Sequence, residues 1–172
     1  MGASRLPPAV TSNTIGGEDA VVVKGQLATW DAVMEFMLAG NATFTLRSLR
    51  TGTRFTYRVR VKKEDADAKT EDPTYFVSLL RGRDNESDYA YVGVLRRDLG
   101  LRLTAASRMG RRAPAVVGLV WFLDAARCRR EVLGTRLEFW HEGRCGRCGR
   151  KLTVPQSILD GFGPECQGLR TR

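Results

Sequence analysis

The stretch TFTLRSLRTGTRFTYRVRVKK, residues 43–63, decides the fold of this 172-residue chain. Two runs of alternating residues flank the turn sequence RTGT, which is the pattern of a β-hairpin. Side chains of a strand point alternately to opposite faces, so one face of the second run is apolar. That face carries Phe55, Tyr57, Val59 and Val61. An apolar sheet face has to be covered, and this predicts a layer of helices against the hairpin.

Further strands are expected on both sides of the hairpin. The segments TYFVSLL (74–80) and YAYVGVL (89–95) alternate in the same way and are joined by the polar loop RGRDNESD. We expect the acidic stretch 64–72 to be a loop and residues 21–23 to be a short strand. The sequence therefore predicts an antiparallel meander of about four strands.

Two helices are expected to pack on this sheet, which gives the α+β class. Thr29 can cap the first helix, and Gly40 can stop it. Pro114 stands where the second helix can begin, and that helix would run to about Arg130. The residues expected to face the core are Trp30, Val33, Met34, Met37 and Leu38 on the first helix, and Val116, Val117, Val120, Trp121 and Leu123 on the second.

Composition and charge restrict the class of protein. Lys and Arg number 28 against 19 Asp and Glu, a net charge of +9, which favours polyanionic partners. The chain has no run of eighteen apolar residues and no signal-peptide pattern, so we expect a cytoplasmic protein without membrane contact. The predicted organisation is a flexible arm (1–20), an α+β domain (21–136) and a zinc-binding module (137–172) that begins with a short strand.

The last third of the chain holds the residues with metal chemistry. His141, Cys145, Cys148 and Cys166 form an H-x3-C-x2-C-x17-C array. Two thiolates separated by two residues can turn toward one point, and Zn²⁺ accepts three such ligands and an imidazole in a closed tetrahedral site. Cys128 is the alternative fourth ligand. Disulfides would be the other use of four cysteines, but the CxxC unit and the lack of an export signal favour a reduced zinc site.

The same array argues against catalysis. Zinc deaminases combine H-x-E with a distant P-C-x-x-C, whereas here His141 and Glu142 are adjacent and the CxxC follows closely. Four protein ligands would leave no position for a zinc-bound water, so a structural zinc is expected. The chain contains no GxxxxGK[ST] loop, and its single histidine leaves no base for a Ser-His or Cys-His pair.

At these residues the chain resembles a domain family of unknown function that is common in phage, prophage and actinobacterial proteins. The resemblance rests on His141, then CGRCGRKLTVPQSI (145–158), then GFGPEC (161–166). The hairpin and the segment DNESDYAYVG (84–93) also resemble the leader domain of such phage proteins. The resemblance implies zinc binding and a mobile-element context, and the family has no settled activity.

The polar face of the hairpin is a candidate nucleic-acid surface. Arginines at regular intervals on a sheet can follow phosphates, and tyrosines beside them can stack on bases. The tyrosines considered are Tyr75, Tyr89 and Tyr91. The basic residues are Arg47, Arg54, Arg58, Arg60 and Lys62 on the hairpin, with Arg144, Arg147 and Arg150 around the CxxC unit.

Three functions remain open at this level. The first is a non-enzymatic accessory protein that binds DNA or RNA, with zinc as a structural element. The second is a protein-interaction factor, for instance an anti-defence or host-takeover protein, which docks on a host protein and leaves the arginines as a solvated face. The third is an enzyme whose site is not visible in the sequence.

Overall fold

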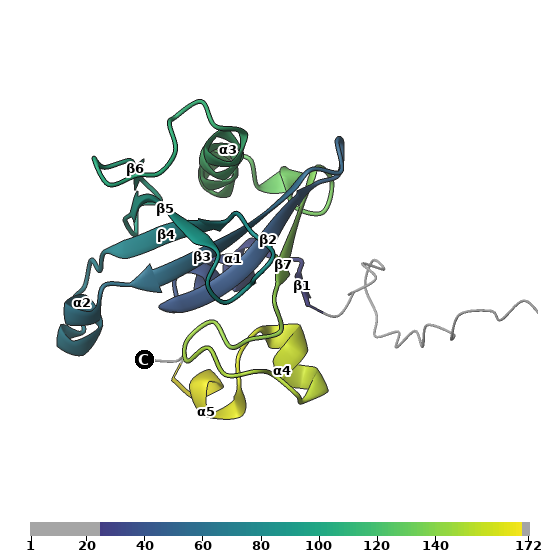
Figure 1. The fold of residues 1–172 in the computed structure, drawn as a ribbon. Coiled ribbons are helices and arrows are strands. Elements are labelled where there is room, and N and C mark those ends of the chain that lie inside the picture. The colour runs from purple at the N-terminus through teal and green to yellow at the C-terminus, as the bar shows by residue number, and fades with distance from the viewer. Residues whose placement is uncertain (1–24, 170–172) are drawn as a thin grey trace, which may run out of the picture.

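A computed structural model describes residues 25–169 of the chain. Its centre is a seven-stranded antiparallel sheet with the order β1-β7-β2-β3-β4-β5-β6 (Figure 1). The strands are β1 (Gln26–Leu27), β2 (Asn41–Ser48), β3 (Arg54–Val61), β4 (Tyr75–Leu80), β5 (Tyr89–Leu95), β6 (Leu101–Arg102) and β7 (Leu137–His141). The helices are α1 (Trp30–Met37), α2 (Lys63–Ala68), α3 (Pro114–Cys128), α4 (Pro155–Asp160) and α5 (Pro164–Gln167), with a 3-10 turn at Arg130–Val132.

The antiparallel α+β class is confirmed, but the sheet has seven strands instead of four. The predicted meander is β2-β3-β4-β5, in that order. β1 and β6 have two residues each, which is too short to show any alternation in the sequence. β7 lies between β1 and β2, so the predicted short strand of the zinc module is also a strand of the main sheet. The predicted arm (1–20) and the strand at 21–23 lie outside the described residues.

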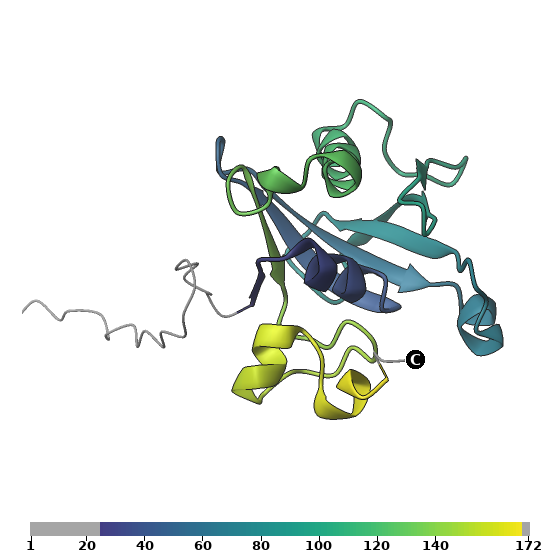
Figure 2. The same ribbon diagram turned by 180° about the vertical axis from the view of Figure 1, so that it is seen from behind.

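One face of the sheet is covered by α1 and α3, as Figure 2 shows from the helix side. Phe44 of β2 stacks on Phe139 of β7 with ring centroids 4.5 Å apart, and Phe122 of α3 packs against both rings. The Tyr57 hydroxyl donates a 2.7 Å hydrogen bond to the Ala115 carbonyl at the start of α3. The aromatic contacts and this buried hydrogen bond fix α3 on the sheet.

The predicted helix ends agree with the structure, whereas two local predictions were wrong. Thr29 accepts a hydrogen bond from the Ala32 N–H at the start of α1, and Pro114 is the first residue of α3. The acidic stretch expected to be a loop contains the short helix α2. On α3, Val117 and Val120 are 52% and 40% exposed. Leu119 and Phe122 are buried instead. They lie three and six positions after the buried Val116, so they share its face of the helix, which points toward the sheet.

The other face of β7, β2 and β3, which we call the outer face, carries the polar side chains. The cross-strand register places them in rows. From the hairpin turn inward, the rows are Glu138–Arg47–Arg54, Trp140–Thr45–Thr56, Thr43–Arg58 and Asn41–Arg60. Neither α1 nor α3 covers this face (Figure 1).

Candidate metal centre and outer face

Three cysteines come together in the C-terminal module, which we define as residues 142–169. The sulfur atoms of Cys145, Cys148 and Cys166 all lie within 4.8 Å of one another. Zn–S bonds of about 2.3 Å require tetrahedral sulfurs roughly 3.8 Å apart, so a small closure of the cluster accommodates the ion. Cys145 and Cys166 are buried and Cys148 is exposed. The cluster has the soft, thiolate-rich composition that zinc accepts, and the three predicted cysteines therefore form a candidate metal centre.

Short backbone contacts shape this centre. The Cys145 N–H donates to the Arg150 carbonyl, and the Gly149 N–H donates back to the Cys145 carbonyl at 2.9 Å, which closes the turn between the first two cysteines. Cys166 lies in α5, whose start at Pro164 follows the turn at Gly163. The turn through Gly163 and Pro164 returns the chain so that Cys166 lies beside the other two cysteines.

Phe36 of α1 joins the module to the sheet. Its ring is fully buried and contacts Phe139, His141 and Phe162. Two glycines of the module lie directly against this ring. A Cβ at Gly146 would lie 2.8 Å from Phe36 Cδ2, and a Cβ at Gly161 would lie 2.6 Å from the same atom. Gly146 and Gly161 thus permit the close approach of the module backbone to the Phe36 ring.

The environments of two buried thiols differ in their effect on ionisation. Burial raises the pKa of Cys145, but N–H groups of Cys148, Gly163 and Arg147 hydrogen-bond to its sulfur and bring the pKa below its ordinary value. Burial, with the hydrogen bonds that the Cys166 thiol donates to the neighbouring sulfurs and the charge of those sulfurs, raises the pKa of Cys166 to about 12. Three thiolates repel one another without a cation, so the binding of a divalent metal would release protons from this cluster.

His141, the predicted fourth ligand, is not part of the cysteine cluster. Its Nδ1 accepts a 3.0 Å hydrogen bond from the Gly143 N–H, and its Nε2 lies 2.6 Å from the Ile158 carbonyl. A carbonyl can only accept, so Nε2 carries the proton and Nδ1 uses its lone pair. In this arrangement the imidazole has no free lone pair for a metal. Its hydrogen bond to the Ile158 carbonyl connects β7 with α4.

Cys128 is not the substitute ligand either. It is exposed at the end of α3, where its thiol donates to the Asp124 carbonyl, and it does not belong to the cluster. The chain contains four cysteines and one histidine, all within the described residues. A fourth ligand would have to be water or an oxygen ligand such as Glu165, which lines the same cavity of about 190 Å³ and pairs with Arg150.

Replacing His141 with alanine should leave the metal content unchanged but destabilise the fold. The substitution leaves the Gly143 N–H and the Ile158 carbonyl without their buried partner, which costs about 1–3 kcal/mol for each group. Metal analysis and urea unfolding would test both parts. A folded His141→Ala protein that has lost its metal would restore His141 as a ligand.

The same histidine gives a pH dependence. Burial lowers the pKa of His141 below its ordinary value of about 6.5. Below pH 6.5 the unfolded chain binds a proton that the folded chain does not, so the free energy of unfolding falls with falling pH until the folded pKa is reached. The His141→Ala protein should lack this contribution.

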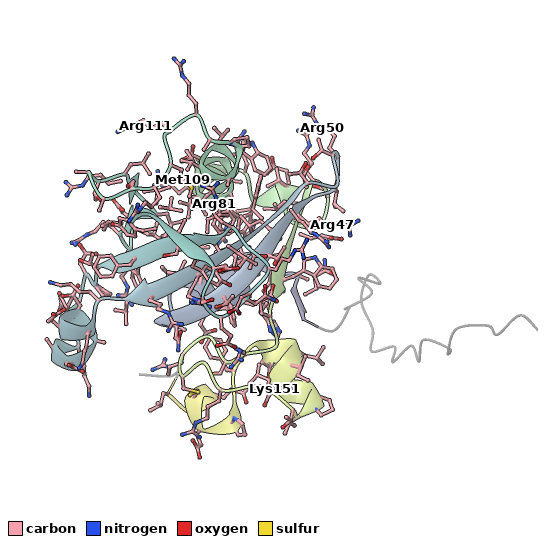
Figure 3. The ribbon with its side chains drawn as sticks, in the orientation of Figure 1. Arg47, Arg50, Arg81, Met109, Arg111 and Lys151 are labelled. Atoms are coloured by element: carbon pink, nitrogen blue, oxygen red, sulfur yellow. The ribbon has the colours of Figure 1, made fainter. Side chains whose placement is uncertain are left out.

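The basic residues do not form one continuous row of free cations. Arg47 pairs with Glu138, and Lys62 pairs with Glu64 beyond the end of β3. Arg150 pairs with Glu165 in the module, and Arg147 is exposed there. Figure 3 shows Arg47 near the hairpin end of the sheet and Lys151 on the module. The remaining predicted residues, Arg54, Arg58, Arg60 and Arg144, line two separate cavities of the outer face.

The cavity nearer the hairpin contains an aromatic residue that sequence reasoning missed. It measures about 520 Å³ and is lined by Thr45, Arg47, Gly52, Arg54 and Trp140. Trp140 is partly exposed, and its Nε1–H donates to Glu138. Alternation along Leu137, Phe139 and His141 could have placed Trp140 on the outer face, once β7 was known to border β2.

The predicted stacking tyrosines separate into different environments. Tyr75 is 3% exposed and faces the core, where its hydroxyl donates to the Leu38 carbonyl, so its predicted role was wrong. The Arg58 guanidinium stacks on the Tyr89 ring, with 3.6 Å between Arg58 Cζ and the ring centroid. Tyr91 contacts Phe76, which is 38% exposed, on the outer side of β4 and β5.

Comparisons with known proteins bear only on the C-terminal part of the chain. Within residues 25–169, no helix has the length and apolar character needed to cross a membrane. No curated protein and no solved structure matches the chain. Residues 136–170, which include the three clustered cysteines, are similar to DUF6011, a family of unknown function.

Proposed function

We propose that this protein is a non-enzymatic accessory protein that binds single-stranded DNA or RNA on its outer face. The observation that carries the proposal is the cavity formed by Trp140, Arg47 and Arg54. Arg47 and Arg54 lie directly opposite each other on β2 and β3, where like charges repel, and among residues 25–169 Glu138 is the one carboxylate that pairs with either of them. A phosphate group would relieve this repulsion, and an unpaired base could stack on the exposed indole.

The metal centre has a structural role in this proposal. We propose zinc as the metal, bound by Cys145, Cys148 and Cys166, because thiolates and a small module favour it. Metal binding would hold the module against β7 and α1. The imidazole of His141 is engaged by backbone groups, so it is not a free base beside the cysteines. A cytoplasmic location and a phage or mobile-element context remain part of the proposal.

A second candidate is an interaction with a host protein. It is favoured by exposed apolar side chains on the module, namely Val154, Leu159 and Leu169, which are 50%, 38% and 51% exposed. A partner of this kind would remain bound in a pull-down from nuclease-treated lysate, whereas nucleic-acid-dependent partners would be lost.

Nucleic-acid binding should depend on Trp140 and on Arg54. A fluorescently labelled thymidine oligonucleotide is expected to bind the wild-type protein at low salt and to dissociate steeply as salt rises, because counterions are released from the phosphates. Trp140→Ala should lower the affinity by about 1–3 kcal/mol through lost stacking. Arg54→Ser should weaken binding and flatten the salt slope by about 0.7. Fluorescence anisotropy over a salt series measures both.

Trp121 offers a matched control for Trp140. It is a partly exposed tryptophan on α3, on the opposite side of the sheet, and contacts Arg129. Trp121→Ala should therefore leave oligonucleotide affinity unchanged. Equal affinities for all four proteins, or no binding at low salt, would contradict the nucleic-acid proposal and favour the protein partner.

A further inference from the structure

The polar connection RGRDNESD crosses the outer face and contacts Arg58 of that face and Arg144 of the module. It comprises residues 81–88 between β4 and β5 and runs in front of β3 and β2 in Figure 1. The Arg58 guanidinium donates to the backbone carbonyls of Asn85 and Glu86 at 2.9 and 3.1 Å. Arg144 of the module donates to the Glu86 carboxylate at 2.6 Å. Glu86 therefore lies where the sheet and the module meet.

The internal hydrogen bonds of this connection leave one carboxylate for the arginines. Asp84 accepts from the Glu86 N–H and from the Ser87 hydroxyl, and Asp88 accepts from the Asp84 N–H. These two aspartates are used to fold the connection itself. Glu86 is the acidic residue of the connection whose carboxylate pairs with a cation, and its side chain remains 74% exposed.

A polar cavity of about 360 Å³ lies beside Glu86. Three guanidinium groups line it, from Arg58, Arg60 and Arg144, and two carboxylates, from Glu86 and Glu142. Glu142 accepts a hydrogen bond from the Thr45 hydroxyl. Each guanidinium carries five N–H donors, so the donors of the three arginines outnumber the acceptors around them.

The arginines of this cavity are held in place before any ligand binds. The Arg58 guanidinium stacks on the Tyr89 ring at 3.6 Å, and Arg60 donates to the Asn41 amide oxygen at 2.5 Å. Partial burial and then the charge of Arg58 lower the pKa of Arg60, and the charge of Glu86 offsets part of this effect, so the two guanidinium groups lie close enough to repel each other. Such fixed and crowded guanidinium groups favour a multivalent anion.

Two buried polar atoms beside the cavity have unused hydrogen-bonding capacity. Arg58 Nε and the Tyr89 hydroxyl have no hydrogen-bond partner among the residues that the structure describes. Buried donors without partners cost free energy, and native proteins retain few of them. Both residues line the cavity, so a bound anion there is a candidate partner for these atoms.

We infer that this cavity is a phosphate-binding site and that Glu86 occupies it as an internal competitor. Carboxylate and phosphate oxygens are bound by guanidinium in the same way, so Glu86 satisfies Arg144 as a phosphate would. The phosphate can belong to a nucleic-acid backbone, in which case the site extends the proposed binding surface and rests on that function, or it can be free. Binding at the site requires that the Glu86 carboxylate leave Arg144.

The test compares Glu86→Gln with a control that removes an equal charge elsewhere. Asp124→Asn serves as this control, since Asp124 pairs with Arg127 on the exposed side of α3, across the sheet from the outer face. Glu86→Gln should bind the thymidine oligonucleotide several-fold more tightly than wild type, with a salt slope steeper by about 0.7 because one more phosphate is contacted. Asp124→Asn should change neither quantity by a comparable amount.

Inorganic phosphate is the second probe and separates the two proposals. NMR shifts of the arginine Nε–Hε signals should give a several-fold tighter phosphate affinity for Glu86→Gln than for wild type or Asp124→Asn. If phosphate behaves in this way but no oligonucleotide binds, the site is supported and the nucleic-acid function is wrong. If Glu86→Gln matches Asp124→Asn with both probes, the site is overturned, even where Trp140→Ala still lowers oligonucleotide affinity.

Discussion

Replacing Cys145 with serine is expected to abolish metal binding and to unfold the C-terminal module. Cys145 is buried and belongs to the cysteine cluster. Its sulfur accepts hydrogen bonds from backbone N–H groups, which stabilise the thiolate form that binds a metal. Structural zinc contributes about 10–16 kcal/mol of apparent binding free energy in small finger peptides, which is more than such a module gains from its apolar contacts. Metal analysis should show about one ion per wild-type chain and almost none in the variant.

Limited proteolysis would detect the unfolding of the C-terminal module that metal loss is expected to cause. Arg147, Arg150 and Lys151 are exposed trypsin sites within the module, and cleavage there should become rapid in Cys145→Ser or after chelation. Cys128→Ser is the control, because that thiol lies on α3 outside the cluster, and it should retain metal and protection. Full metal occupancy in the Cys145→Ser protein would show that the cluster is not the metal site.

Truncation of Phe36 should cause the largest loss of stability among single core substitutions in α1. Phe36 is 0% exposed and touches β7 and the module at once, so Phe36→Ala leaves a cavity between them. Such substitutions cost about 3–5 kcal/mol. The neighbours of the ring include Gly146 and Gly161, which have no side chains that could move into the cavity. Urea unfolding should show the loss as a lower midpoint.

Phe76 provides the matched comparison for Phe36. It is the same residue type on β4, but it is 38% exposed on the outer side of the sheet. Phe76→Ala should therefore cost less stability, since part of the Phe76 side chain remains in water in the folded protein and its removal leaves no enclosed cavity. Equal destabilisation by the two substitutions would mean that Phe36 is not the link between the sheet and the module.

Local features of the sequence predicted much of the fold. Alternation along 43–63 predicted β2 and β3 and sorted their faces correctly. The cap at Thr29 and the proline at 114 gave the starts of α1 and α3. The spacing of the cysteines predicted which three of them meet. Strand alternation, the helix starts and the CxxC turn depend on residues a few positions apart, and such short-range geometry is fixed by backbone chemistry.

The features that only the tertiary structure decided all depend on distant partners. His141 lost its expected role as ligand because the Ile158 carbonyl, seventeen residues away, binds its Nε2. Trp140 became part of the outer face because β7 pairs with β2. The two terminal nitrogens of Arg58 donate to carbonyls of the connection before β5, a partner that the strand alternation could not reveal although it placed Arg58 on the correct face. Periodicity and spacing determine where a side chain points, whereas its partner depends on which remote segment packs there, and no local pattern encodes that choice.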